Sequence, residues 1–540
     1  MEKILNKALK TSERLNEFYI ETSKIDFKNA CVYLVEKKQA LLRLMFAADE
    51  REIDNVFRIY SVFSVPGINK LYIIVLSLHE DDAEFPSITH LIPSAHWYER
   101  EINDMFGLTP NGHPDPRRLV LHDEFPAGVY PLRKDYRFKN GGWFKGQGER
   151  ISSQESAMSD KKELAACPLP LAPYKFMQVE GEGIYEIPVG PVHAGIIEPG
   201  HFRFSAVGET IFFLEPRLFY THKGTEKHFE RLGFADGVKL AERVSGTSSF
   251  SHSSAYCMAV ERMAGLEITE NAQAIRTLLL ELERLYNHIG DIGNICAGTG
   301  LAVGYAKGAV IKEQLMQLNE RLAGSRYLRG VNTIGGVAKD ILQHRDDILS
   351  AIEIITKDYK KLMKLLLGAI SHVERLENTG RLSRDIALKL GATGITARAS
   401  GINDDLRKSH PHLLYDRLEF EVHTMAKGDV FSRMMLRAEE AECSISMINT
   451  LLETSYRGDL AVKVNNIPEC SSALGYTESP RGSVFYWVMS DKNGMPLRVK
   501  LRSPSFCNWP VVPFAVHGNI VPDFPLCNKS FNLSYSGCDM

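Results

Sequence analysis

Three stretches of the chain repeat apolar residues with the period of an α-helix. The first covers 275–289 and the second covers 434–452. The third covers 348–373, alternates steps of four and three residues, and is expected to end near Gly380. Three amphipathic stripes of this length predict a helix bundle whose apolar faces meet in a common core.

The N-terminal part of the chain has shorter apolar runs and a mixed pattern. Its charged first residues, Met1–Phe18, fit an amphipathic helix and do not resemble a signal peptide. The elements expected next are strands at Cys31–Leu34, Leu41–Met45 and Leu71–Leu78, and a helix near Asp49–Val62. This pattern predicts a small α+β domain over residues 1–138.

Residues 139–170 differ in composition from the regions on either side. They are rich in glycine, serine and charged residues, and they end in Pro168-Leu169-Pro170. Such a segment has too little apolar surface to pack, so it is expected to be a linker. A second domain then covers 171–540, and we interpret the chain as a fusion of two domains. The length of 540 residues agrees, because it exceeds the usual size of one hydrophobic core.

Composition excludes several classes of function. The net charge of −3 gives no electrostatic footprint for nucleic acid or acidic lipid. The nine cysteines form no CxxC pair, which argues against a zinc or iron–sulfur site made by this chain alone and against a disulfide framework. The longest apolar runs, such as Leu71–Leu78, are too short to span a bilayer. Contact with a membrane is therefore expected only through partner subunits.

Two motifs organise the second domain: ERVSGTSSFSH at Glu242–His252 and FNLSYSGCDM at Phe531–Met540. Together they resemble the paired metal-binding motifs of nickel–iron hydrogenase large subunits, in which four thiolates hold the metal. The resemblance implies that the four ligand positions are Ser245, Ser248, Ser534 and Gly537. None is a cysteine, and soft metals of this kind select thiolates. We therefore expect no metal in this chain and no hydrogenase activity.

The same motifs bear on two other activities. A serine hydrolase would need a base beside the nucleophile. His252 lies seven residues after Ser245, but the local sequence offers no third member of a triad. The resemblance also implies that no segment remains to be cleaved after Met540, as it is in many nickel enzymes. In complex I the first motif carries a quinone-binding tyrosine, and the matching position here is Gly246.

Three motifs in the first domain mix aromatic residues with charges of both signs: His96–Gly107, Gly112–Leu119 and Pro131–Tyr136. Their composition suits either a solvated charged face or a docking surface. Their order and spacing resemble the 30-kDa subunit of respiratory complex I. That resemblance implies a domain without a redox centre that serves assembly.

The second domain opens with a loop, Gly190–Phe204, that carries His193, Glu198 and His201. Titratable groups on a turn can handle protons, although an ordinary surface loop has the same composition. The loop resembles the one that lines the active or quinone cavity in hydrogenases and in the 49-kDa subunit of complex I. The resemblance places Glu198 where group-4 hydrogenases carry a proton-transfer glutamate, and His201 near the quinone-headgroup histidine.

Three later motifs match the same families. Tyr220–Lys227 is expected to be a turn that positions the next helix. His288 lies on a predicted helix, where a lone histidine is more often structural; the resemblance implies a place near the iron–sulfur cluster of a neighbouring small subunit. Arg481, on a Pro-Gly turn, is implied to overhang the cavity as a fixed positive charge.

The predicted fold is an α+β domain followed by a mainly α, hydrogenase-large-subunit-like domain with a helix-bundle core and a small N-terminal β region. The predicted function is that of a subunit of a membrane-associated, complex I-like or hydrogenase-4-like oxidoreductase. Glu198, His193, His201 and Arg481 would line its quinone-like acceptor cavity. The expected partners are an iron–sulfur small subunit, a ferredoxin-like subunit and membrane ion-pump subunits, at the cytoplasmic face of the cell membrane. The alternative is a non-catalytic coupling or scaffold subunit.

Overall fold

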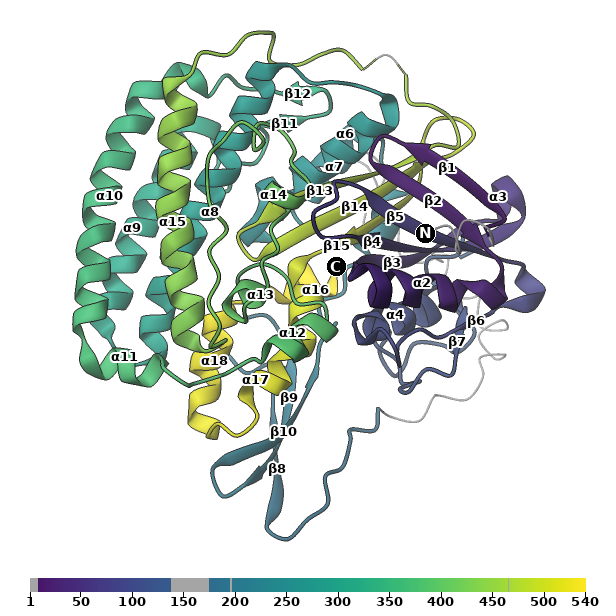
Figure 1. Cartoon of the computed structure of the whole chain (residues 1–540), viewed down its shortest axis with the longest axis horizontal. Coiled ribbons are helices and arrows are strands. Elements are labelled where there is room, and N and C mark those ends of the chain that lie inside the picture. The colour runs from purple at the N-terminus through teal and green to yellow at the C-terminus, as the bar shows by residue number, and fades with distance from the viewer. Residues whose placement is uncertain (1–7, 137–173, 195–196, 465) are drawn as a thin grey trace, which may run out of the picture.

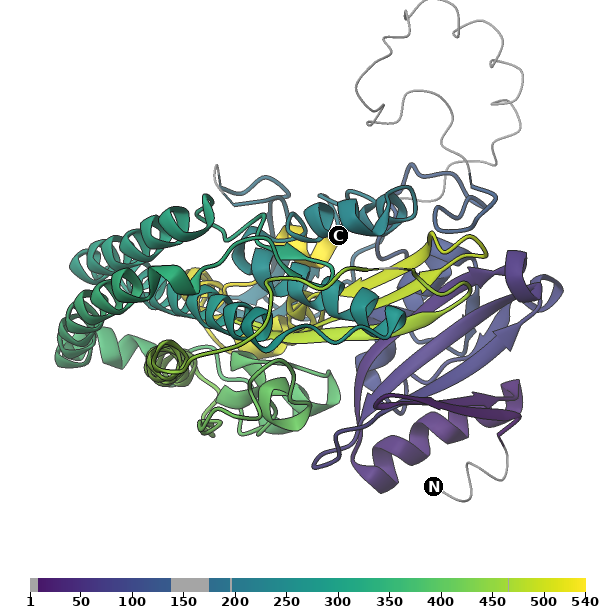
Figure 2. The ribbon, with the colours of Figure 1, turned by 90° about the horizontal axis from the view of Figure 1, so that it is seen from above.

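The computed structural model describes residues 8–136, 174–194, 197–464 and 466–540 (Figure 1). The predicted linker at 139–170 lies outside the described residues, as do the first seven residues of the predicted N-terminal helix. Figure 2 shows the N-terminal sheet and the helix bundle at opposite ends of the molecule, with a second sheet between them. Among the described residues, no helix has the length and apolar character needed to cross a bilayer.

The N-terminal sheet has five strands in the order β1-β2-β5-β4-β3. They are β1 (Lys10–Arg14), β2 (Glu17–Thr22), β3 (Leu41–Glu50), β4 (Val56–Ser64) and β5 (Leu71–Leu78). Only β2 and β5 pair in parallel. Helix α2 (Lys24–Lys38) packs on β2 and β5, and α4 (His96–Phe106) packs on β3. The smaller elements are α3 (Arg51–Asp54) and the parallel pair of β6 (Glu84–Pro86) and β7 (Thr109–Asn111).

The sequence predicted some of these elements correctly and others wrongly. The strands at Leu41–Met45 and Leu71–Leu78 are confirmed. The strand predicted at Cys31–Leu34 is wrong, because these residues form part of α2. The helix predicted at Asp49–Val62 is mostly strand, and the described part of the predicted N-terminal helix contains β1 and β2.

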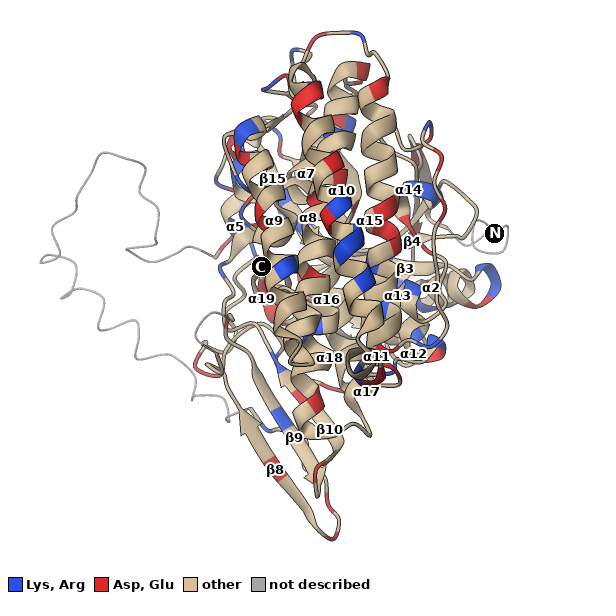
Figure 3. Cartoon of the chain, turned by 90° about the vertical axis from the view of Figure 1, so that its left-hand side faces the viewer, with Lys and Arg blue, Asp and Glu red and all other residues tan. Residues whose placement is uncertain are grey.

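The bundle is built around α8 (Glu270–Gly298), which packs against α9 (Ala302–Ala323) and α15 (Val430–Glu453). Helix α10 (Arg345–Gly368) packs on the outside of α9 and α15. Helices α8 and α9 approach closely at Gly293 and Gly308. A Cβ at position 308 would lie only 2.6 Å from the Cα of Gly293, so a side chain there would clash. Figure 3 shows charges of both signs on the bundle's outward faces. The three predicted stripes are confirmed as helices, except that the third breaks at Ala369 into α10 and α11 (Ile370–Leu376).

The second sheet, β13 (Ser472–Ser479), β14 (Gly482–Ser490) and β15 (Pro496–Arg502), is almost entirely buried. Helix α7 (Ser249–Ala264) packs on it. Trp487 of β14 meets Phe46 and Tyr60 of the N-terminal sheet at ring-centroid distances of 4.9 and 5.0 Å. The apolar core therefore runs without a break from the N-terminal sheet into the second half of the chain.

The other elements connect these layers. A three-stranded sheet of β8 (Ile184–Val189), β9 (His201–Val207) and β10 (Thr210–Arg217) projects at the bottom of Figure 1. The remaining helices and strands are α5 (Thr225–Phe229), α6 (Phe234–Ala241), β11 (Asn332–Thr333), β12 (Gly336–Val337), α12 (Arg384–Lys389), α13 (Ile395–Ala399), α14 (Leu406–Ser409), α16 (Pro504–Asn508), α17 (Val512–Val516), α18 (Phe524–Phe531) and α19 (Tyr535–Asp539). The mixed helix and strand content and the N-terminal sheet agree with the predicted fold class.

Candidate functional site

The two organising motifs meet in space. Ser245 immediately precedes the 3-10 turn Gly246–Ser248, and Ser534 is the N-cap of α19. Their hydroxyl oxygens are 3.2 Å apart, with the Ser245 hydroxyl donating to Ser534. The fold therefore brings together two segments that are 289 positions apart in the chain.

The other two ligand positions lie at the same place. The Gly537 N–H donates to the Ser534 hydroxyl at 2.9 Å, and the Ser248 N–H donates to the Ser245 carbonyl at 3.3 Å. A Cβ at position 537 would lie 3.0 Å from the Ser534 hydroxyl oxygen and 3.2 Å from the Cβ of Ser245. The four positions that the resemblance named therefore lie in two short segments that contact each other, and none of them carries a thiol. We call these four residues the serine cluster.

The serine cluster offers little chemistry of its own. The Ser245 hydroxyl faces Thr247 at 3.0 Å as well as Ser534, and neither is a base. His252 is fully buried, and its Nδ1 lies 2.9 Å from the hydroxyl of Tyr486. Burial lowers the pKa of His252 to about 3. Among the described residues, no group of three or more His, Cys, Asp or Glu side chains could hold a metal ion.

Arg481 joins the bundle to both motifs. Its guanidinium donates to Asn287 at 2.9 Å, to Asp291 at 3.2 Å and to the backbone carbonyl of Asn532. Asn287 in turn donates to the Thr247 carbonyl at 2.8 Å. Burial opposes ionisation of Asp291, but the guanidiniums of Arg481 and Arg437 keep the pKa of its carboxyl below the usual value. The serine cluster therefore lies beside a buried ionic network whose hydrogen-bond donors already have partners.

Two residues of the predicted proton-handling loop contact α19. The Glu198 carboxylate accepts a hydrogen bond from the Ser536 N–H at 2.8 Å. His193 places its Nε2 3.4 Å from the Tyr535 hydroxyl. His201 lies elsewhere, with its Nδ1 3.3 Å from the Gly190 carbonyl and its ring against Phe176. Burial lowers the pKa of His201.

His288 belongs to a buried network inside the bundle. Its Nε2 is 2.9 Å from a carboxylate oxygen of Glu440. Burial lowers the pKa of His288, and Glu440 opposes that shift. Arg398 pairs with Glu440 at 2.7 Å and with Glu478 at 3.0 Å, so His288 sits at the edge of a chain of ion pairs.

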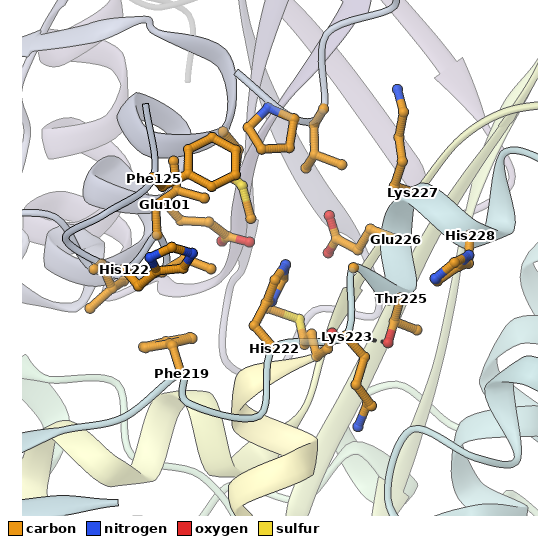
Figure 4. Close-up of a pocket in the computed structure, with 18 of the residues that line it drawn as sticks. Glu101, His122, Phe125, Phe219, His222, Lys223, Thr225, Glu226, Lys227 and His228 are labelled. Atoms are coloured by element: carbon orange, nitrogen blue, oxygen red, sulfur yellow. Dashed lines mark hydrogen bonds between the residues drawn. The ribbon is translucent and has the colours of Figure 1, made fainter. Parts of the chain in front are cut away.

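The sequence did not identify a cavity with a volume of about 850 Å³ (Figure 4). It lies between α4 of the first domain and the segment that leads into α5 of the second. Its lining includes Glu101, His222, Glu226 and Met540. The Tyr220–Lys227 motif contributes to this lining, but the sequence predicted only that it is a turn before a helix. That prediction is confirmed, because α5 begins at Thr225.

The C-terminal end of α19 is bonded to residues near the cavity. The ring of His222 bonds through Nδ1 to the Asp539 carbonyl at 2.6 Å. The Asp539 carboxylate accepts hydrogen bonds from the N–H and hydroxyl of Thr221 at 3.0 and 2.8 Å. Burial raises the pKa of Asp539 to about 6. The C-terminal end of α19 and its neighbours therefore carry titratable groups that sequence reasoning missed.

Comparison with known proteins agrees with the predicted resemblance. Residues 20–141 match the family described as "Respiratory-chain NADH dehydrogenase, 30 Kd subunit", and residues 299–473 and 461–540 match the corresponding 49 Kd subunit family. The chain is 34% identical to formate hydrogenlyase subunit 5 of Escherichia coli, over 99% of this chain and 90% of the relative. It is 35% identical to hydrogenase-4 component G of the same species, over 94% of this chain and 85% of the relative.

Two further relatives extend the comparison. The fused C/D component of NADH-quinone oxidoreductase from Phocaeicola vulgatus is 30% identical over 79% of this chain and 81% of the relative. A chain in the solved structure of the membrane-bound sulfane sulfur reductase, an archaeal respiratory membrane complex, is 28% identical with a TM-score of 0.62. That match covers 66% of this chain and 99% of the other. The chain therefore belongs to the family of fused 30-kDa and 49-kDa complex I-type subunits that includes formate hydrogenlyase subunit 5 and hydrogenase-4 component G.

Proposed function

We propose that this chain forms the electron-acceptor cavity of a membrane-associated, complex I-like oxidoreductase, without a nickel–iron centre. The names of its relatives support the setting: NADH-quinone oxidoreductase, formate hydrogenlyase, hydrogenase-4 and a membrane-bound sulfane sulfur reductase. The chain would not be active alone. It would dock an iron–sulfur small subunit, a ferredoxin-like subunit and membrane ion-pump subunits, at the cytoplasmic face of the cell membrane.

One observation carries the proposal: the two motifs that resemble metal-binding motifs meet in space, and hydroxyls stand where the resemblance leads us to expect thiolates. Ser245 and Ser534 are 3.2 Å apart, and Gly537 contacts Ser534. A hydroxyl stays protonated at neutral pH, so it cannot replace a thiolate as a ligand for a soft metal. Two motifs that are present without thiolate ligands fit a subunit that passes electrons to an acceptor without using nickel.

The predicted site residues are given roles within this proposal. Glu198 and His193 touch α19 through Ser536 and Tyr535, which supports a part in moving protons to and from the site. His201 would serve the same loop from the opposite side. Arg481, through its ion pair with Asp291, would hold positive charge over the serine cluster. His288 would lie nearest the partner's iron–sulfur cluster.

The second candidate is a coupling or scaffold subunit, and the buried ion pairs favour it. Arg43 of the N-terminal sheet binds Asp404 through two hydrogen bonds of 2.6 Å, and the Asp404 carbonyl accepts from Arg398 at 2.9 Å. Arg398 then pairs with Glu440, the partner of His288. A chain of buried ion pairs from the first domain to the bundle suits a part that transmits movement as one unit.

The two candidates are separated by an experiment on the native complex, isolated from gently solubilised membranes through a tag on this chain. The complex is reduced with candidate donors, and its iron–sulfur EPR signal is followed while a quinone or a polysulfide is added. Reoxidation by either acceptor supports the electron-acceptor role. A reducible cluster that neither acceptor oxidises supports the scaffold role, as does a complex without any cluster.

Variants of this chain locate the effect. Glu198→Gln and His201→Ala are expected to slow reoxidation if the predicted loop moves protons to the acceptor. Glu209→Gln is the matched control, because Glu209 is an exposed carboxylate on the turn between β9 and β10. Unchanged turnover in both loop variants would show that these roles are wrong, even if the acceptor role of the chain stands.

A further inference from the structure

The cavity between the two domains has apolar walls. Its apolar lining comes from both domains: Met105, Phe125 and Leu132 from the first, and Phe219, Leu240 and Met540 from the second. In Figure 4, residues of the first domain, among them His122 and Phe125, face the Lys223–His228 segment of the second. The volume of about 850 Å³ lies within the range of pockets that enclose small molecules.

The open side of the cavity is positively charged. Five of the residues that line the cavity are exposed: His122, Tyr220, Lys223, Arg231 and Arg243. Three of these five are cations and none is an acid. The part of the lining that meets solvent therefore attracts anions.

The charges deeper in the cavity are already balanced. The two acids of the lining, Glu101 and Glu226, are buried and contact the Lys500 ammonium at 2.5 and 3.0 Å. Arg498 contacts Glu226 at 2.7 Å, so two buried acids face two buried cations. These acids therefore do not cancel the charge of the open side.

Two further cations of the lining are paired with acids. Lys227 is buried and pairs with Glu230 at 3.1 Å, and Arg217 is half-buried and pairs with Asp123 at 2.8 Å. The net charge that a ligand meets therefore comes from the three exposed cations of the open side.

Lys223 forms no ion pair with a described residue. Its ammonium lies 3.5 Å from the Ser536 carbonyl, and the carboxylates of Glu198 and Asp539 act on it only at longer range. Desolvation lowers the pKa of Lys223. An anion beside the ammonium would oppose that shift, because a neighbouring opposite charge favours the charged form.

Arg243 has donors to spare. Its side chain is 56% exposed, and one Nη nitrogen donates to the Lys239 carbonyl at 2.6 Å. The same nitrogen lies 3.6 Å from a carboxylate oxygen of Glu242. A guanidinium carries five N–H donors, so the others can bond to an acidic group that arrives from solvent.

We propose that this cavity binds an amphiphilic anion, a molecule with one apolar chain and one acidic group at its end. The chain occupies the apolar interior, and the acidic group lies at the open side beside Lys223, Arg231 and Arg243. The fused first domain then supplies part of a ligand site, in addition to any role in assembly. The proposal is independent of the electron-acceptor role, because binding requires no electron transfer and no partner subunit.

The test uses the purified full-length chain and dansylaminoundecanoic acid, a fluorescent molecule with an apolar chain and one carboxylate. Dansyl emission moves to shorter wavelength in apolar surroundings, so we expect a saturable shift. Dodecanoate should displace the probe. Dodecanol has the same chain without the charge, so it should compete about tenfold or more weakly.

Two additions to this experiment characterise the acidic group. Salt should weaken competition by dodecanoate and leave competition by dodecanol unchanged, because it screens exposed charges. Dodecyl phosphate is then compared with dodecanoate. Stronger competition by dodecanoate assigns the site to a free carboxylic acid, and stronger competition by dodecyl phosphate assigns it to a phosphate headgroup.

Variants of the open side test the cations. Lys223→Gln and Arg243→Gln are each expected to weaken dodecanoate binding by about 2- to 10-fold and to leave dodecanol binding unchanged. Combined with Arg231→Gln, they should bring the affinity for dodecanoate close to that for dodecanol. Lys239→Gln is the matched control, because Lys239 is an exposed cation of α6 that does not line the cavity. Leu240→Trp narrows the cavity and should weaken the acid and the alcohol alike.

Four results would overturn the proposal. The first is the absence of a saturable shift, and the second is equal competition by dodecanoate and dodecanol. The third is an affinity for dodecanoate that is the same in the combined variant and in Lys239→Gln. The fourth is probe binding that Leu240→Trp leaves unchanged, which would place the probe elsewhere. Circular dichroism spectra that match the unmodified chain confirm that a variant has folded.

Discussion

Two sites of different kinds lie near the C-terminal helix α19. The first, the serine cluster, is closed: the Ser245 hydroxyl, the Ser534 hydroxyl and the Gly537 N–H bond to one another. The second site is a cavity of about 850 Å³ whose lining includes Met540, the residue after α19, and residues of both domains. The first site holds small neutral groups that bond to one another. The second is an open cavity with titratable side chains in its lining.

The difference shows that the residues of a recognisable sequence motif need not be the residues that line a cavity. The sequence motifs that resemble metal-binding motifs lead to small neutral side chains that satisfy each other. His222 and Glu101, by contrast, line an open cavity, and they come from segments interpreted as a turn and as a docking surface. Substitutions at the two sites should therefore lower the free energy of unfolding by different amounts. Breaking a buried ion pair costs far more free energy than removing a hydrogen bond between neutral hydroxyls.

The largest effect is expected from Lys500→Met on the cavity side. Lys500 is 1% exposed and pairs with both Glu101 and Glu226. Removing its ammonium leaves two buried carboxylates with less compensation, which should lower the free energy of unfolding by about 3–5 kcal/mol. Urea denaturation at pH 7 measures the change.

The control is Lys357→Met, because Lys357 forms a 2.7 Å pair with Glu353 on the exposed face of α10. That substitution should leave the urea midpoint unchanged, because exposed pairs contribute little. Similar midpoints for the Lys500 and Lys357 variants would remove the energetic contrast between the cavity floor and an ordinary surface.

The next largest effect concerns pH and Asp539, which lies at the C-terminal end of α19. Burial raises the pKa of Asp539 from 3.8 to about 6. An acid whose pKa is raised on folding stabilises the protein at low pH, and this contribution is lost as pH rises through about 6. A shift of about two units corresponds to a loss of about 3 kcal/mol between roughly pH 4 and pH 7.

Asp539→Asn should remove this contribution, so its free energy of unfolding should fall less between pH 5 and pH 8 than that of the unmodified chain. Urea denaturation at several pH values makes the comparison. Asp416→Asn serves as the control, since Asp416 is exposed, and it should keep the original pH dependence. If the Asp539→Asn and Asp416→Asn variants lose stability equally with rising pH, Asp539 is not the titrating group.

The sequence predicted the long helices better than the short elements, for a physical reason. A stripe such as 275–289 repeats the helical period over several turns, and α8 buries almost its whole length. Cys31–Leu34 is a four-residue apolar run, which fits a strand or one turn of a helix equally well. The decisive signal lay outside it, in Ser23, whose side chain caps α2 by accepting from the Asp26 N–H.

The helix predicted near Asp49–Val62 failed for a related reason. Only Arg51–Asp54 form a helical turn, which ends at Asn55 in the left-handed conformation. The residues that follow, Val56–Ser64, are rich in β-branched and aromatic side chains and pair with β3 and β5. The conformation of such a segment depends on pairing with other strands. The hydrophobic pattern within the segment does not reveal those strands.

The candidate site was predicted only in part. The meeting of the two motifs followed from the resemblance. Glu198 and His193 contact α19, while the role predicted for their loop stays a prediction. The cavity could not be predicted, because Glu101 and His222 lie in different domains. Neither residue stands out locally, and the cavity exists only once the two domains are packed together.

The smallest effect is expected on the serine side, from Ser534→Ala. The Ser534 hydroxyl caps α19 by accepting from the Gly537 N–H at 2.9 Å, and it also accepts from Ser245. Loss of an N-cap costs about 1 kcal/mol, and Ser245 keeps its contact with Thr247 at 3.0 Å. The free energy of unfolding, measured by urea denaturation, should therefore fall by about 1 kcal/mol.

Ser536→Ala is the matched control, because the Ser536 hydroxyl makes only a 3.4 Å contact with Ser534. Its removal should have no measurable effect. A loss from Ser534→Ala as large as that from Lys500→Met would mean that the serine cluster stabilises the fold as strongly as the buried ion pairs of Lys500. The energetic contrast between the two sites would then be absent.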